Sequence, residues 1–147
     1  MPVNFSDEII IANFFREYLR CHEWEICQLV CSGGQAHMSI SYTVYDRRKT
    51  VFPDVIAIKN NTILIGEIKG RFNESDKLKL LEIYVSSLAQ DRLKKNISLR
   101  FNLIAEELEI KYALIHGQLD SMADPFVYQY KFNGLSFEIC LPDSGVR

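Results

Sequence analysis

Two acidic residues and a lysine occur at positions where a β-hairpin would bring them together. Asp54 directly precedes the apolar run Val55–Ile58, and Glu67 and Lys69 lie near the end of the run Thr62–Lys69. The Asn60-Asn61 pair between the runs suits a tight two-residue turn, because Asn tolerates positive φ. Residues that face each other across such a hairpin have numbers that sum to 121, so Asp54 faces Glu67. Facing Cβ atoms in an antiparallel pair are about 4.5 to 5.5 Å apart.

Two carboxylates at that separation repel each other unless a proton or a cation lies between them. Mg²⁺ is the natural cation, because it prefers oxygen ligands and keeps water in its remaining positions. Strand alternation places Lys69 on the same face as Glu67. Two acids, a divalent metal and an ammonium group suit phosphodiester hydrolysis. The alternative is an ordinary exposed Glu-Lys pair, but Glu67 interrupts an apolar run whose neighbours are expected to be buried on both faces.

The elements that must position these residues follow from the hydrophobic periodicity. A helix is expected over Ser6–Leu19, with Ser6 as a possible N-cap, and a second over Asn73–Asn96, with Leu81, Tyr84, Val85 and Leu88 on its buried face. The expected strands are Trp24–Val30, Met38–Val44, Val51–Ile58, Thr62–Lys69 and Ile110–His116. An ordinary turn at Ser32-Gly33-Gly34 separates the first two, and a charged turn at Asp46–Lys49 separates the second and third. A final hairpin is expected over Phe126–Leu141, with its turn at Asn133-Gly134. This order predicts an α/β or α+β fold with a mixed central sheet flanked by helices.

Composition limits the possible classes of protein. The chain has 147 residues, 48% of them hydrophobic, and a formal charge of −2, which predicts a single domain over residues 1–147. We expect no membrane-spanning segment and no secretory signal, and therefore a cytoplasmic protein. A pI near 5.9 argues against indiscriminate coating of nucleic acid. Residues 46–100, however, contain 12 Lys and Arg against 7 Asp and Glu, which is compatible with local phosphate binding.

With Pro53-Asp54 on one strand and Glu67-Ile68-Lys69 on the next, the sequence resembles the PD-(D/E)xK nuclease superfamily, which has the restriction-endonuclease-like fold. The resemblance implies an αβββαβ core over residues 7 to about 116, followed here by the C-terminal hairpin. It also implies that Asp54, Glu67 and the Ile68 carbonyl hold the metal, and that Lys69 positions or activates the attacking water.

Two further residues are candidates for the same site. Members of the superfamily often add an acid from the first helix, and Glu8 shares the inward stripe of that helix with Ala12 and Phe15. Glu8 could equally stabilise the helix dipole at the N-terminus. In the second helix, Lys77 either reaches the scissile phosphate or extends its ammonium group from a buried stem to water.

The leading hypothesis is an endonuclease that uses Mg²⁺, or Mn²⁺ as a substitute, to hydrolyse DNA to a 5′-phosphate and a 3′-hydroxyl. A homodimer is expected, with the apolar residues of the C-terminal hairpin either forming the dimer contact or completing the core. A second hypothesis is a catalytically silent module that binds DNA or a partner protein. A third is an unrelated α/β interaction protein, in which the hairpin register would have to differ.

Overall fold

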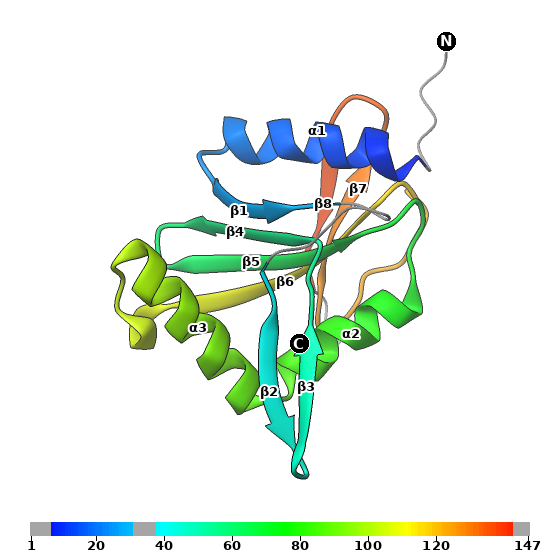
Figure 1. Cartoon of the computed structure of the whole chain (residues 1–147). Helices are drawn as coiled ribbons and strands as arrows, with labels where there is room; N and C mark the ends of the chain where they lie inside the picture. The colour runs from blue at the N-terminus through cyan, green and yellow to red at the C-terminus, as the bar shows by residue number, and fades with distance from the viewer. Residues whose placement is uncertain (1–6, 31–37, 143–147) are drawn as a thin grey trace.

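The computed structural model describes residues 7–30 and 38–142, which form a mixed α/β structure (Figure 1). The predicted fold class is therefore confirmed at this level. Within the described residues, no helix is both long and apolar enough to cross a membrane. The elements are α1 (Glu8–Cys21), β1 (Glu25–Leu29), β2 (Ile40–Val44), β3 (Arg47–Val51), β4 (Val55–Lys59), β5 (Thr62–Ile68), α2 (Glu74–Tyr84), α3 (Ser87–Phe101), the 3₁₀ turn η1 (Ala105–Glu107), β6 (Glu109–His116), β7 (Tyr128–Phe132) and β8 (Phe137–Cys140).

Six strands form one mixed sheet in the order β1-β4-β5-β6-β7-β8. Strands β1, β4 and β5 are antiparallel neighbours, β6 is parallel to both β5 and β7, and β8 returns antiparallel to β7. The connection from β5 to its parallel neighbour β6 passes through α2 and α3, as a parallel pair requires a long crossover. Strands β2 and β3 form a separate hairpin that projects from the sheet (Figure 1).

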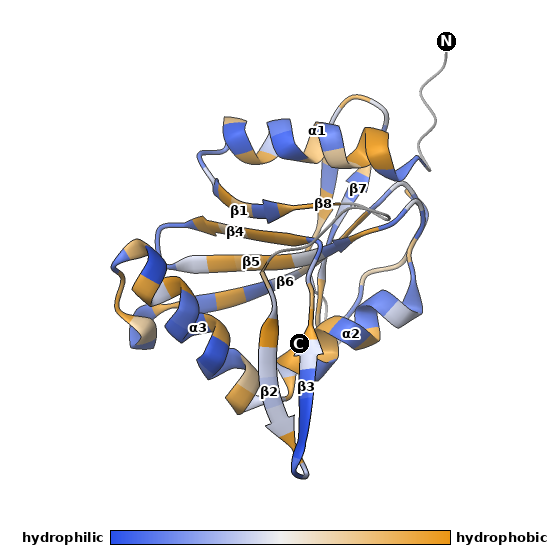
Figure 2. Ribbon diagram, viewed as in Figure 1, coloured by the Kyte–Doolittle hydropathy of each residue, from blue (hydrophilic) through white to orange (hydrophobic). Residues whose placement is uncertain are grey.

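The sheet is covered on both faces. Helix α1 packs on one face, where Ile11, Phe15 and Leu19 meet Leu64 and Ile68 of β5. Helices α2 and α3 cover the other face, together with the β2–β3 hairpin. Because both faces are buried, β4 and β5 are almost continuously apolar rather than alternating, as Figure 2 shows by their colour.

The first helix begins one residue later than expected. Asp7 is its N-cap, with Oδ1 accepting hydrogen bonds from the backbone nitrogens of Ile9 (2.9 Å) and Ile10 (3.3 Å). The predicted cap Ser6 and the predicted turn at Ser32-Gly33-Gly34 lie outside the described residues. The predicted inward stripe is correct at Ala12 and Phe15, which are both buried.

The prediction of one helix over Asn73–Asn96 is wrong, because the chain forms two helices there. Asn73 caps α2, but Ser86 is extended and its Oγ accepts from the Ala89 nitrogen, which starts α3. The Gln90 side chain donates to the Ile83 and Tyr84 carbonyls at the end of α2, and the Ser86 nitrogen also donates to the Ile83 carbonyl. The break shifts the helical phase, so the predicted buried face is also wrong, and the buried residues are Leu80, Ile83, Ala89, Leu93 and Ile97.

Two strand boundaries also differ from the prediction. The segment predicted as a charged turn, Asp46–Lys49, is mostly strand β3, and the turn is formed by Tyr45 and Asp46, both at positive φ (50° and 64°). The expected strand Val51–Ile58 is divided, because β3 ends at Val51 and β4 begins only at Val55. Pro53, which has no N–H to donate to a ladder, lies in the gap.

The predicted C-terminal hairpin is confirmed as β7–β8, with Gly134 at φ 99° in its loop. It extends the sheet beyond β6 rather than standing apart. Val127 and Phe132 are fully buried, and Phe137 packs against the same core as α1. Of the two roles expected for these apolar residues, these three contribute to the core, whereas Phe126 is 43% exposed.

Gly66 is required by the close approach of β5 to β6. A Cβ atom there would lie 2.8 Å from Cδ1 of Ile115 and 2.9 Å from the carbonyl oxygen of Ala113. We expect Gly66→Ala to lower the free energy of unfolding by about 1 to 3 kcal/mol, the usual cost of overpacking a core. Urea denaturation measures the loss. Ile115→Val should recover part of it in the double variant, since it removes Cδ1, and strictly additive losses would contradict this explanation.

Candidate active site

Asp54 and Glu67 meet at one end of the β4–β5 hairpin, as the sequence predicts. The register pairs Val55 with Gly66 and Lys59 with Thr62, which extends to Asp54 opposite Glu67. The backbone nitrogen of Asp54 donates to Glu67 Oε2 at 2.8 Å, and the backbone nitrogen of Ile68 donates to Asp54 Oδ2 at 3.0 Å. Each carboxylate is thus held by the backbone of the opposite segment, an arrangement that we call the carboxylate clamp.

The loop that carries Asp54 is itself fixed by β1. The buried Gln28 side chain donates to the Pro53 carbonyl at 2.7 Å and to the Met38 carbonyl at 3.1 Å, and its Oε1 accepts from the Met38 nitrogen at 2.7 Å. The nitrogen of Val30 donates to the Asp54 carbonyl at 2.9 Å. Gln28 therefore positions Asp54 without touching its carboxylate, a role for which the sequence carries no motif.

Glu67 is a buried acid, with 1% of its surface exposed. Burial, followed by the charge of Asp54, raises the pKa of Glu67 to about 8, although hydrogen bonds from Lys79 and from the Asp54 backbone oppose the shift. Lys79 forms an ion pair with Glu67 Oε1 and donates to the Phe52 carbonyl at 2.9 Å. This lysine thus connects α2 to both sides of the carboxylate clamp.

Asp76 adds a further acid from the first turn of α2. Its Oδ2 is buried and accepts no hydrogen bond from the described residues. Burial raises the pKa of Asp76, the charges of Lys69 and Lys79 lower it, and those of Asp54 and Glu8 raise it. These influences bring Lys69 and Glu8, both predicted from the sequence, into one electrostatic cluster with the carboxylate clamp. The N-termini of α1 and α2 lie at the end of the sheet where β5 ends (Figure 1).

Lys77 points elsewhere. Its Nζ lies 2.5 Å from Asp124 Oδ2 and 3.6 Å from Glu74 Oε1, so the structure does not bring it to the carboxylate clamp. Lys79 reaches that position instead. The helical phase is the signal that would have found it: once Leu80 and Ile83 are taken as the inward residues of α2, positions 76 and 79 lie on the same stripe.

Backbone hydrogen bonds fasten the segment after Lys69 to the end of β6. The nitrogen of Lys69 donates to the Ile115 carbonyl at 3.0 Å, and that of Gly117 donates to the Gly70 carbonyl at 2.9 Å. His116 is buried, accepts from the Gln118 nitrogen through Nδ1 and contacts Gln129 Oε1 through Nε2 at 2.8 Å. Burial lowers the pKa of His116, so the neutral ring is favoured. These hydrogen bonds hold the segment between Lys69 and α2 against the end of β6.

The donor chemistry of this cluster fits a hard divalent cation. Asp54 and Glu67 are oxygen donors oriented by backbone hydrogen bonds, and the unsatisfied Oδ2 of Asp76 lies in the same charge cluster. The predicted carbonyl ligand, Ile68, follows Glu67 directly. Within residues 7–30 and 38–142, no group of three or more His, Cys, Asp and Glu side chains is already arranged to hold a metal ion. The cation facing Glu67 in this structure is the Lys79 ammonium group.

The chain matches no protein-family model, and comparisons with curated proteins and with solved structures likewise returned no match.

The raised pKa of Glu67 predicts how stability depends on pH. Between about pH 4.5 and pH 8 the folded protein keeps a proton on Glu67 that the unfolded chain releases, so the free energy of unfolding falls as pH rises. Glu67→Gln removes this contribution. The difference in stability between wild type and variant should change by up to about 1.4 kcal/mol per pH unit within the window, as measured by urea denaturation. A difference that is constant from pH 4.5 to 8 would contradict the assignment.

Removing the ammonium group of Lys79 should have a pH-dependent cost. In Lys79→Met, Glu67 loses the charge that stabilises its ionised form, so its pKa rises further. We expect the loss of stability to be about 1.4 kcal/mol larger at pH 9 than at pH 6, because pH 9 lies about one unit above the pKa of Glu67 and the variant must keep this acid protonated there. Lys59→Met, at the other end of the β4–β5 hairpin, is the control. Equal losses at both pH values would show that Lys79 does not act through charge.

Proposed function

We propose that this protein is a Mg²⁺-dependent endonuclease of the PD-(D/E)xK superfamily, with Mn²⁺ as a possible substitute, that hydrolyses DNA to 5′-phosphate and 3′-hydroxyl ends. The carboxylate clamp between Asp54 and Glu67 is the observation that carries the proposal. A cytoplasmic location, a homodimer and a protein partner stay predictions.

The order of elements supports the proposal. Helix α1, strands β1, β4 and β5, the helical crossover α2–α3 and strand β6 follow the αβββαβ order of a restriction-endonuclease-like core. The β2–β3 hairpin is then an insertion between the first and second core strands, and β7–β8 is an extension at the far edge. The sequence resemblance places the acids and lysine on the second and third core strands, which correspond to β4 and β5.

Each side chain then has a distinct role in the proposed reaction. Asp54, Glu67 and the Ile68 carbonyl would hold the metal, with Asp76 and Glu8 as further acids near it. When bound, Mg²⁺ polarises the phosphoryl group and lowers the pKa of water. Lys69 positions the attacking water or offsets the negative charge that develops on the phosphate. Lys79 limits the repulsion between the acids until substrate and metal supply positive charge of their own.

Asp54→Asn tests the proposal with little change in shape. We expect metal-dependent cleavage of duplex, flap or junction DNA to fall about a hundredfold or more, since the lost charge supports several kcal/mol of transition-state stabilisation and each 1.4 kcal/mol is tenfold. Lys69→Ala should behave similarly. Cleavage is followed on labelled substrates by gel electrophoresis with Mg²⁺ and with Mn²⁺.

Asp120→Asn, an exposed carboxylate in the loop after β6, is the matched control and should cleave as wild type does. Circular dichroism and urea denaturation establish that the variants fold. A folded wild type that cleaves none of these substrates with either metal would overturn the nuclease proposal, as would an Asp54→Asn variant that retains full activity.

The ion pair between Lys79 and Glu67 favours one alternative, a catalytically silent module that binds DNA or a partner protein. With a pKa near 8, Glu67 is largely protonated at neutral pH, and an ammonium group already faces it. A silent module would bind DNA or a protein with equal affinity in wild type and Asp54→Asn and would show no metal-dependent cleavage. Activity that increases with pH toward 9 would instead favour the nuclease, because metal ligands must be deprotonated.

A further inference from the structure

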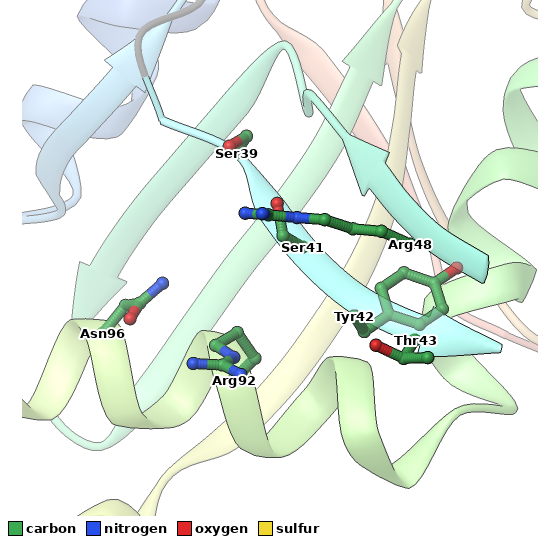
Figure 3. A pocket seen from close by; sticks show the side chains of 7 residues that line it. All are labelled: Ser39, Ser41, Tyr42, Thr43, Arg48, Arg92 and Asn96. Carbon is green, nitrogen blue, oxygen red and sulfur yellow. The ribbon is translucent and has the colours of Figure 1, made fainter. Parts of the chain in front are cut away.

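A polar groove lies between the β2–β3 hairpin and α3, apart from the carboxylate clamp. Its volume is about 490 Å³, and Figure 3 shows the side chains along it, which come from the hairpin on one side and from α3 on the other. The lining residues are Ser39, Ser41, Tyr42, Thr43, Arg48, Arg92 and Asn96. No carboxylate is among them, so the groove combines two guanidinium groups with neutral hydrogen-bonding groups.

The strand register explains why polar residues line one side. Ser41 pairs with Thr50 and Thr43 with Arg48, so alternation places these side chains on the same face of the hairpin. The opposite face carries Ile40 and Val51, which are buried in the core. In Figure 3 the Arg48 side chain lies across the hairpin toward Ser41.

Helix α3 supplies the other side. Arg92 and Asn96 are four residues apart and therefore neighbours on one helical face, whereas Leu93 and Ile97 face the core. In the part of the chain that the structure describes, neither Arg48 nor Arg92 has an ion pair or hydrogen bond, and both are exposed. By contrast, Lys49 on the other face of the hairpin is paired with Glu82 at 2.9 Å. The positive charge in the groove is thus available to a ligand.

The chemistry of the groove matches a phosphodiester. Guanidinium groups donate two parallel hydrogen bonds to phosphate oxygens, and serine hydroxyls and asparagine amides are common further donors to a nucleic-acid backbone. The one aromatic lining residue, Tyr42, is 5% exposed and offers little ring surface on which a base could stack. The groove is therefore suited to the backbone and not to a base.

We propose that this groove binds backbone phosphates of the DNA whose cleavage is proposed above, at a distance from the scissile bond; the inference thus rests on the proposed function for its substrate.

Strand β3 leads directly to the carboxylate clamp. Arg48 and Asp54 are six residues apart, so their Cα atoms are separated by about 20 Å at most. One strand of a duplex carries a phosphate about every 3.4 Å along the helix axis. A single DNA segment of about six base pairs can therefore reach both places.

Binding to labelled duplex DNA in EDTA, where no bond is cleaved, tests the groove directly. Arg48→Ala and Arg92→Ala each remove one guanidinium group that would neutralise a phosphate. At 0.1 M salt, each substitution should weaken binding about five- to eightfold and reduce the slope of log K against log salt by about 0.7 to 0.9. Arg48→Lys should retain most of the binding, because it keeps the charge. Arg16→Ala and Arg20→Ala, in α1 on the opposite face of the sheet, remove the same charge far from the groove.

Comparing DNA binding with hydrolysis of a small substrate distinguishes an effect on the groove from an effect on the catalytic centre. A small phosphodiester such as bis(p-nitrophenyl) phosphate is too short to span the catalytic centre and the groove, so its hydrolysis at the catalytic centre should be the same in the groove variants as in wild type. Unchanged affinity and salt slope in the groove variants, or equal losses in the α1 controls, would overturn the proposal. If wild type cleaves no substrate but the groove variants alone still lose DNA binding, the groove stands and the nuclease proposal fails.

Discussion

The burial of one carboxylate, that of Glu67, constrains much of this structure. An acid with 1% exposure can be kept in a hydrophobic sheet only if its oxygens find partners. One oxygen accepts the backbone N–H of Asp54 and the other faces the ammonium group of Lys79. These partners come from different elements, the loop before β4 and the helix after β5. The fold must therefore hold three segments in register to keep one carboxyl group inside.

Strand register and close packing meet that requirement. A slip of one residue between β4 and β5 would turn Glu67 from the face covered by α2 to the face covered by α1, where Lys79 could not reach it. Gly66 lets β6 approach closely enough to support the end of β5. Gln28 fixes the other side by holding the Pro53 carbonyl. The same contacts that stabilise the central sheet thus orient Asp54, Glu67 and the segment leading to Lys69.

The β2–β3 hairpin adds a second polar feature to this framework. It packs its apolar face against the core, and residues of its serine- and arginine-bearing face line a groove together with Arg92 and Asn96 of α3. Because β3 runs on into the loop that carries Asp54, the groove and the carboxylate clamp are joined by a short stretch of chain. Four of the basic residues of the segment 46–100 lie at these two sites, Lys69 and Lys79 near the carboxylate clamp and Arg48 and Arg92 in the groove, and the acidic remainder of the chain accounts for the near-neutral total.

The amino-acid sequence by itself determined the β4–β5 hairpin, its register and the pairing of Asp54 with Glu67, since a two-residue Asn60-Asn61 turn between apolar runs leaves few alternatives. It also predicted the C-terminal hairpin and the inward residues of α1. Only the tertiary structure decided which residues of the second helical segment face the acids. That choice depends on the break at Ser86 and on the Gln90 hydrogen bonds to the carbonyls at the end of α2. Local periodicity cannot reveal such a phase shift, because two short helices in different phases resemble one amphipathic helix until each is packed against the sheet. For this reason the periodicity indicated Lys77, whereas the lysine of α2 that meets Glu67 is Lys79.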